Sequence, residues 1–185
     1  VDKTLLIRDI LDERAKVSLF TRPRRFGKTL TMDMLKTFFE ISAENTSILF
    51  QDKDIWKCGK KYQDHQGKYP VIFLSFKDVK CDSWKDTYKL ITQIIDLEFQ
   101  RHSVLNDSEK VTIKKYYQRI VAGEADEGEY AFSLKHLSQM LREHYGIAPI
   151  IIIDEYDTLI QQGHTKDFYD KIVEFMRNLF SGCLK

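Results

Sequence analysis

Residues 16–29, KVSLFTRPRRFGKT, decide the fold class. They open with a short apolar run, residues 17–20, whose length and composition predict a β-strand. A polar turn and a Gly-Lys-Thr tripeptide follow, and the apolar residues beyond the tripeptide recur at helical spacing over 29–42. A strand, a loop, Gly-Lys-Thr and a helix in this order predict a phosphate-binding P-loop.

The residue types of the tripeptide suit that chemistry. Gly27 lacks a Cβ atom where the loop must approach a ligand closely. Lys28 can place a cation on the β- and γ-phosphates, and Thr29 offers a hydroxyl group to Mg²⁺. The full pattern G-x-x-x-x-G-K-[ST] has a glycine where this chain has Arg22, and the tripeptide alone also occurs by chance, so a second motif is needed.

We expect the nucleotide to contact the whole loop and the start of the helix behind it. The expected binding residues are Arg22, Pro23, Arg24, Arg25, Phe26, Gly27, Lys28, Thr29 and Leu30. Two of the arginines, Arg24 and Arg25, are also candidate catalytic residues, because they can bind the γ-phosphate or reach a neighbouring subunit as an arginine finger. Solvated loop charges would explain these arginines equally well.

The second motif is an acidic pair that follows four consecutive isoleucines, residues 150–153. Such a run predicts a buried strand, and Asp154 and Glu155 stand at its C-terminal tip. Asp154 can hold Mg²⁺ beside Thr29, and Glu155 can activate a water molecule. Alone, the pair could simply cap the next helix. Together with the Gly-Lys-Thr loop it predicts binding of ATP or GTP with Mg²⁺, around which the two strand tips converge.

The remaining segments predict an α/β domain with a parallel sheet sandwiched by helices. Residues 69–76 predict a further buried strand. A helix over 1–14, around capping residues Asp2 or Thr4, could lie near the nucleotide or serve only for packing. We expect one domain over 1–185 with a helical insertion at about 84–145. The other predicted helices cover 84–102, 109–121, 130–145 and 166–180, and the predicted loops cover 62–68 and 122–129.

Composition limits the function classes. The formal net charge of +1 provides no overall electrostatic field that would attract nucleic acid or an anionic membrane. Whether nucleic acid is a partner is left open. No apolar run approaches the length that crosses a bilayer, and no secretory signal opens the chain. The three scattered cysteines show no zinc-binding spacing. We therefore expect free thiols and a cytoplasmic protein.

Four segments together resemble the prokaryotic AAA-ATPase-like family of predicted P-loop ATPases. These are VDKT at 1–4, TRPRRFGKT at 21–29, the strand and loop at 69–80, and IDEYD at 153–157. The resemblance implies an ASCE-type P-loop NTPase fold, with Lys28 on the phosphates, Thr29 and Asp154 on Mg²⁺, and Glu155 as the catalytic glutamate. It makes Arg22 a family trait. Members often carry a C-terminal nuclease-like domain of the PD-(D/E)xK type.

The resemblance also implies a sensor strand between the P-loop strand and the strand that ends in Asp154. Residues 1–185 stop before such a strand, so we expect open sheet edges, possible homo-oligomer contacts, and weak or no turnover from these residues alone.

Three functions fit these motifs. The first is an ATPase, and the second is a nucleotide-gated binding module that regulates a partner domain or nucleic acid. The third is a small-molecule kinase, but kinases of that kind need an arginine-rich lid, which the acidic segment 122–129 does not resemble.

Overall fold

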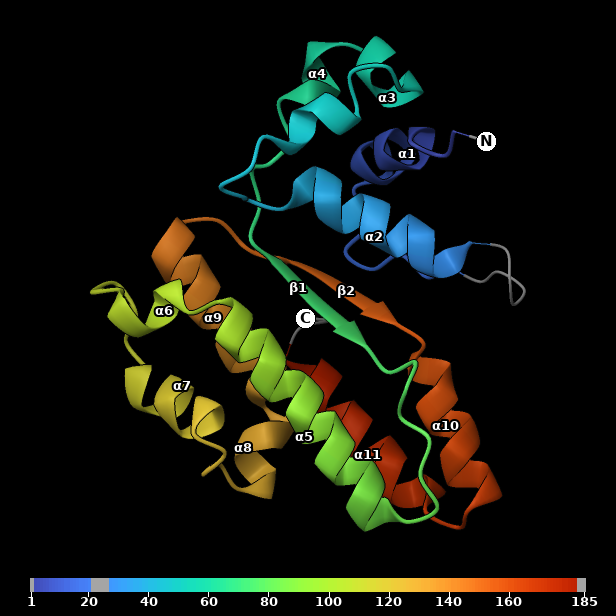
Figure 1. The fold of residues 1–185 in the computed structure, drawn as a ribbon, viewed down its shortest axis with the longest axis vertical. Helices are drawn as coiled ribbons and strands as arrows, with labels where there is room; N and C mark the ends of the chain where they lie inside the picture. The colour runs from blue at the N-terminus through green and yellow to red at the C-terminus, as the bar shows by residue number, and fades with distance from the viewer. Residues whose placement is uncertain (1, 21–26, 183–185) are drawn as a thin grey trace. The chain divides into compact units, whose positions relative to one another are not determined.

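The computed structural model describes residues 2–20 and 27–182. The chain divides into two compact units, Val1–Val71 and Ile72–Lys185, and each unit is described by itself. Figure 1 shows the elements and their labels.

The first unit is helical. It contains α1 (Leu5–Glu13), α2 (Lys28–Phe39), the 3₁₀ helix η1 (Thr46–Leu49), α3 (Asp54–Lys57) and α4 (Lys60–Gln63). Its core gathers fully buried apolar side chains from three of these helices, Ile7, Phe38 and Ile55. The Phe38 ring meets the Phe50 ring edge-on, with 5.0 Å between the centroids. The helix predicted after Gly-Lys-Thr is confirmed, and helix α4 corrects the predicted loop at 62–68, whose first two residues are helical.

The predicted P-loop strand at residues 17–20 is wrong. These residues form no strand, and Val17 and Leu19 are 55% and 66% exposed. Apolar composition is not sufficient for a strand, because the backbone N–H and C=O groups need a neighbouring chain to pair with. In the described part of the first unit, the one β-bridge joins Glu40 to Tyr69 instead.

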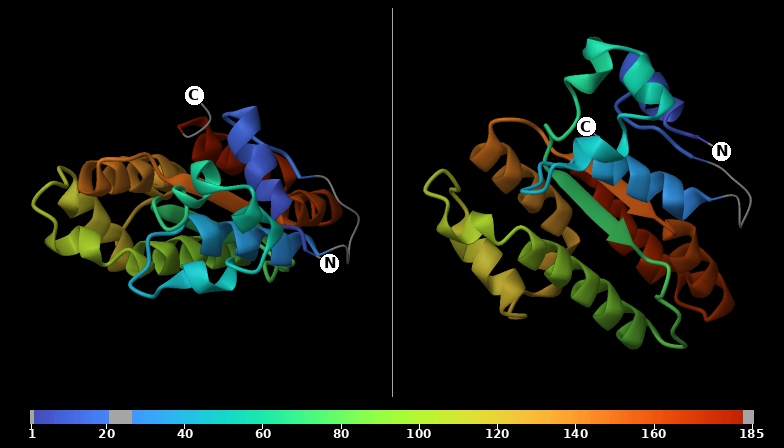
Figure 2. Two further views of the ribbon diagram at one scale, coloured as in Figure 1. Left: turned by 90° about the horizontal axis from the view of Figure 1, so that it is seen from above. Right: turned by 45° about the horizontal axis from the view of Figure 1, so that its top comes forward.

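The second unit contains the sheet. Its elements are α5 (Trp84–Arg101), α6 (Val104–Asp107), α7 (Lys114–Val121), α8 (Glu127–Ala131), α9 (Ser133–Tyr145), β2 (Ile150–Asp154), α10 (Tyr156–Thr165) and α11 (Tyr169–Ser181), with β1 (Val71–Ser75) beginning at the boundary. The strands β1 and β2 lie side by side and run in the same direction (Figures 1 and 2). The class is therefore α/β, with a small parallel sheet and many helices.

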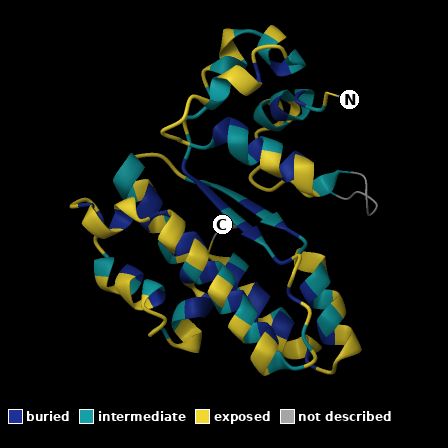
Figure 3. Ribbon diagram, in the orientation of Figure 1, coloured by how far each residue is buried: buried dark blue, intermediate teal, exposed yellow. Residues whose placement is uncertain are grey.

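The core of the second unit lies where strand residues meet helices. Alternating residues of β1 and the segment behind it, Ile72, Leu74 and Phe76, point into a buried cluster with residues of α5, α9 and α11. The buried faces of these helices follow the stripes that the sequence predicts, as Figure 3 shows in dark blue. Ser83 is the N-cap residue of α5, and its hydroxyl oxygen accepts the Asp86 N–H at 3.2 Å.

Three further predictions need correction. The acidic loop predicted at 122–129 ends in helix α8, because Asp126 and Glu129 form a capping box that starts a helix at Glu127. The helix predicted from 109 begins at Lys114, and the helix predicted from 166 begins at Tyr169. Before Tyr169 the chain passes through Asp167, whose left-handed φ of 59° is incompatible with a continuous α-helix from 166.

A buried carboxylate covers the outer edge of β1. The Phe76 N–H donates to the Asp154 carbonyl oxygen across the sheet at 3.0 Å. Successive N–H groups along a strand point to opposite edges, so the Phe73 N–H faces away from β2. That N–H donates to Oε1 of Glu98 on α5 at 2.8 Å. A side chain thus occupies the place where a further strand would bond.

Two neighbours hold this carboxylate. Arg101 donates to both of its oxygens, from Nη2 at 2.6 Å and from Nε at 2.9 Å, and His102 Nε2 lies 3.3 Å from Oε1. Burial of Glu98 works against its ionisation, but the hydrogen bonds from His102 and Arg101 outweigh that effect and hold the pKa of Glu98 below its ordinary value.

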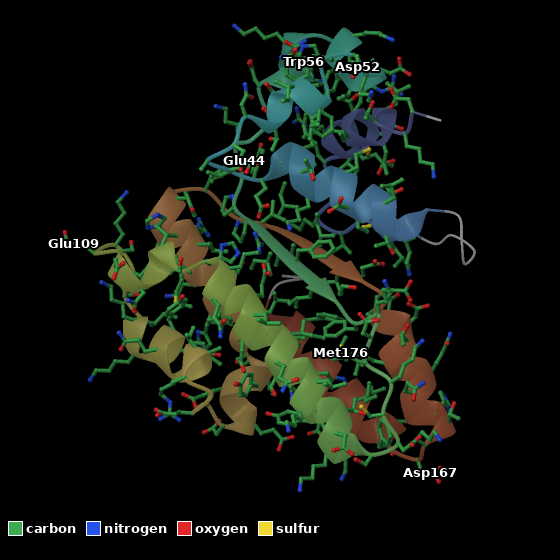
Figure 4. The ribbon with its side chains drawn as sticks, viewed as in Figure 1. Glu44, Asp52, Trp56, Glu109, Asp167 and Met176 are labelled. Atoms are coloured by element: carbon green, nitrogen blue, oxygen red, sulfur yellow. The ribbon has the colours of Figure 1, made fainter. Side chains whose placement is uncertain are left out.

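The helices α10 and α11 pack closely at Gly163. A Cβ atom at this buried glycine would lie 2.9 Å from the Tyr169 backbone Cα atom. The turn between the helices contains Asp167, labelled in Figure 4, whose φ of 59° lies in the left-handed region.

We therefore expect Gly163→Ala to lower the free energy of unfolding by about 1–3 kcal/mol, because backbone must move to admit the methyl group. Urea denaturation measures this change. The matched control is Gly128→Ala in α8, where the added Cβ would meet only a side-chain oxygen of Asp126, at 3.3 Å, and should be nearly neutral. Equal stability of Gly163→Ala and the wild type would contradict the close packing.

The structure also describes two of the three cysteines and the length of the helices. Cys58 and Cys81 are free thiols, as predicted. Within residues 2–20 and 27–182, no helix is both long enough and apolar enough to cross a lipid bilayer.

Candidate functional site

Helix α2 begins in the way that a phosphate-binding helix requires. Gly27 is its N-cap residue and has a φ of 74°, a left-handed conformation that glycine adopts at little cost. The Gly27 carbonyl oxygen accepts hydrogen bonds from the Thr31 N–H at 3.0 Å and the Thr31 hydroxyl at 2.8 Å. These two bonds fix the first turn of the helix just behind Lys28 and Thr29.

The first turn of α2 also has a suitable charge. The N-cap residue Gly27 has no side chain with which to cap the helix, and the first turn of the helix carries no acidic residue. The exposed N–H end of a helix carries a partial positive charge of roughly +0.5, which favours a bound anion. Lys28 and Thr29 are the first two residues of the helix and so stand at this end. Lys28 is half-buried and Thr29 is exposed.

Most of the other residues predicted to bind the nucleotide cannot be placed in the structure. Arg22, Pro23, Arg24, Arg25 and Phe26 lie outside the described residues. Leu30 is described and is 70% exposed, so it is not part of the helix face that packs into the first unit.

Asp154 is the last residue of β2. Asp154 is 1% exposed. Its carbonyl oxygen accepts the Phe76 N–H, and this bond fixes the strand tip in the sheet. The predicted strand therefore ends at the predicted carboxylate. A buried carboxylate needs a cation or hydrogen-bond donors nearby, which is the environment that a metal-binding aspartate uses.

Glu155 follows at the junction of β2 and α10. Its φ of 58° is left-handed, although the residue has a Cβ atom, and this conformation costs on the order of 1 kcal/mol. The Thr158 hydroxyl donates to Oε2 of Glu155 at 3.0 Å. The carboxylate therefore lies beside the Thr158 hydroxyl group in the first turn of α10.

Each unit by itself has an oxygen donor of a kind that Mg²⁺ prefers, the Thr29 hydroxyl group in the first and the Asp154 carboxylate in the second. In the described part of the chain, no three His, Cys, Asp or Glu residues come together to form a metal cage. Mg²⁺ in nucleotide sites is usually held by one or two protein oxygens plus substrate phosphates, so a nucleotide site does not need such a cage.

The sequence-predicted residues therefore form two groups. Lys28 and Thr29 stand at the start of α2 in the first unit, and Asp154 and Glu155 at the end of β2 in the second unit. Sequence reasoning missed two residues that hold these groups, Thr31 and Thr158. A threonine four residues after Gly27 and another three after Glu155 can bond back to those residues, and this spacing was the available signal.

Comparison with known proteins places these observations in one family. The profile of a family described as "Predicted AAA-ATPase" matches residues 1–185, the whole chain. No curated protein and no solved structure matches it.

Proposed function

The chain belongs to the predicted AAA-ATPase family, and on that premise we propose that it binds ATP with Mg²⁺ and hydrolyses ATP to ADP and phosphate. One observation supports the proposal most strongly: a helix that starts at a left-handed glycine and continues with Lys28 and Thr29.

In the proposed site, each residue has a separate role. Lys28 neutralises the oxygens of the β- and γ-phosphates, and the N–H groups at the start of α2 bind the same phosphates. Thr29 and Asp154 supply the hydroxyl and carboxylate oxygens for Mg²⁺, which balances the charge of the phosphates. Glu155 accepts a proton from the attacking water molecule. Arg24 and Arg25 bind the γ-phosphate or act on a neighbouring copy.

Titration calorimetry with Mg-ATP, ATP without Mg²⁺, and Mg-GTP tests the binding step. We expect Lys28→Ala to weaken Mg-ATP binding by about 10- to 100-fold, because a charged hydrogen bond contributes about 1.5–3 kcal/mol. The control is Lys60→Ala, at an exposed lysine of α4 in the same unit, which should bind as the wild type does. A wild-type protein that binds no Mg-ATP would contradict the proposal.

A second function, a nucleotide-gated binding module, is supported by the contact of Glu155. Its carboxylate accepts the Thr158 hydroxyl and so lies against α10. A glutamate held there would leave ATP bound without hydrolysis, and the bound nucleotide would act as a signal.

A further inference from the structure

Two hydrogen bonds join Glu155 to Thr158. The Thr158 N–H donates to the Glu155 carbonyl oxygen at 3.0 Å, and the Thr158 hydroxyl donates to Oε2 of the Glu155 carboxylate, also at 3.0 Å. Glu155 is the N-cap residue of α10, and Thr158 lies in the first turn of that helix. One threonine therefore restrains both the backbone and the side chain of the glutamate.

The elements on both sides hold this pair in place within the second unit. Before Glu155, Asp154 ends β2, and its carbonyl oxygen accepts the Phe76 N–H at 3.0 Å. After Thr158, the side chain of Leu159 is fully buried in the core of the unit. Threonine also limits the directions in which its hydroxyl group can point, because its Cβ atom is branched. The hydroxyl group is therefore presented to Glu155 from a well-packed part of the helix.

The backbone of Glu155 is an independent sign that its side chain has a use. Its φ of 58° is left-handed, and residues with a Cβ atom rarely adopt this conformation. Such conformations persist only where the surrounding structure determines them, and they occur mainly at functional sites. A turn from strand to helix does not by itself require a carboxylate, so the strain at this position points to a role for the carboxylate.

A bond from a hydroxyl group suits a glutamate that has to accept a proton. The side chain of glutamate is long and flexible, so without a restraint it is spread over several rotamers. A general base must lie within hydrogen-bonding distance of the proton that it accepts. The Thr158 hydroxyl uses one acceptor position of Oε2, whereas a carboxylate has about four such positions. The bond therefore restrains the carboxylate of Glu155 without preventing it from accepting a proton.

We propose that Thr158 is a positioning residue for Glu155, whose carboxylate its hydroxyl group holds in the place from which it accepts a proton from the attacking water molecule. This inference rests on the proposed function and adds to that site a residue outside the Gly-Lys-Thr loop and the acidic pair. Thr158 acts through Glu155, so loss of its hydroxyl group affects the chemical step and not the binding of Mg-ATP.

The test is Thr158→Val in the full-length protein, because valine keeps the branched shape and removes the hydroxyl group. Phosphate release should show kcat lowered by about 10-fold, as expected for the loss of one hydrogen bond to a charged group, with Mg-ATP affinity within about twofold of the wild type. Thr158→Ser should recover most of the loss. The control is Thr165→Val in the same helix, where the exposed hydroxyl donates to the Gln161 carbonyl oxygen at 2.9 Å, and it should turn over as the wild type does.

A double-mutant cycle separates positioning from a structural role. In the Glu155→Gln background the carboxylate base is already absent, so the addition of Thr158→Val should lower kcat by no more than about twofold. A loss of the same size in both backgrounds, which a folding defect would also produce, would overturn the role of Thr158.

The remaining outcomes distinguish this inference from the proposed function. If Glu155→Gln slowed turnover and Thr158→Val did not, this inference alone would be overturned. A higher kcat in Thr158→Val would overturn it too, because the hydroxyl group would then be holding the glutamate away from the water molecule, as in the nucleotide-gated module. Absence of turnover by the full-length wild type would overturn the proposed hydrolysis, on which this inference rests.

Discussion

Replacing Glu155 with glutamine is expected to slow ATP turnover by about 100-fold or more, while the affinity for Mg-ATP stays within about twofold of the wild type. Glutamine keeps the shape of the side chain and can still accept the Thr158 hydroxyl, but it cannot take a proton from water. Steady-state phosphate release and titration calorimetry on the same preparations measure the two effects separately.

The control for this variant is Glu174→Gln, at an exposed glutamate of α11 in the same unit, and it should leave both quantities unchanged. Equal turnover by Glu155→Gln and the wild type would contradict a catalytic role for this carboxylate. Because residues 1–185 alone are expected to turn over weakly or not at all, these assays use the full-length protein. A full-length wild-type protein that binds Mg-ATP but releases no phosphate would contradict hydrolysis and favour the nucleotide-gated module.

Removing the carboxylate of Glu98 is expected to lower the free energy of unfolding by about 3 kcal/mol or more. Glu98→Ala removes the carboxylate that the Phe73 N–H at the edge of β1, the Arg101 guanidinium group and the His102 ring all contact. Arg101 is 31% exposed and can turn to water, but the Phe73 N–H cannot leave the strand. Urea denaturation monitored by circular dichroism measures the loss.

The pH dependence of this effect has a definite sign. The folded-state pKa of Glu98 lies below its ordinary value of 4.5, so the stabilisation is fully present above about pH 4.5 and is lost as the pH falls through the lowered pKa. The difference between the wild type and Glu98→Gln should therefore be largest at neutral pH and shrink in acid.

The control for Glu98→Ala is the same substitution at a glutamate on the surface. Glu109 lies at the exposed end of the segment between α6 and α7 (Figure 4), and Glu109→Ala should change stability by at most about 0.5 kcal/mol. If Glu98→Ala were no more destabilising than Glu109→Ala, the carboxylate would not be holding the edge of β1.

The sequence was most informative where one local signal determines the structure. The helix behind Gly-Lys-Thr, the long helix α5 and the two strands follow from hydrophobic spacing and capping residues, and all four are present, although three of the four isoleucines of β2 are only partly buried. Helix α8 was also readable, because Asp126 and Glu129 have the spacing of a capping box, but its acidic, glycine-containing sequence looked like a loop.

Non-local features could not be read in this way. Residues 17–20 have the composition of a strand, but whether such a run pairs depends on a neighbour elsewhere in the chain. The contact between Glu98 and Phe73 joins a helix to a strand edge, and the side chain of Lys3 comes close to Gly27 although the whole of α1 lies between them in the chain. No periodicity in the sequence carries that information, because both contacts arise from tertiary packing.

The backbone at Glu155 has a consequence for how this chain tolerates change. Its left-handed conformation suits glycine better than any residue with a Cβ atom. A library randomised at this codon and sorted only for heat resistance should therefore enrich glycine, followed by asparagine. The same library sorted for nucleotide-dependent activity should return glutamate. Comparing the two sorts would show, at this one position, how strongly the residue that is best for thermal stability differs from the residue that is best for activity.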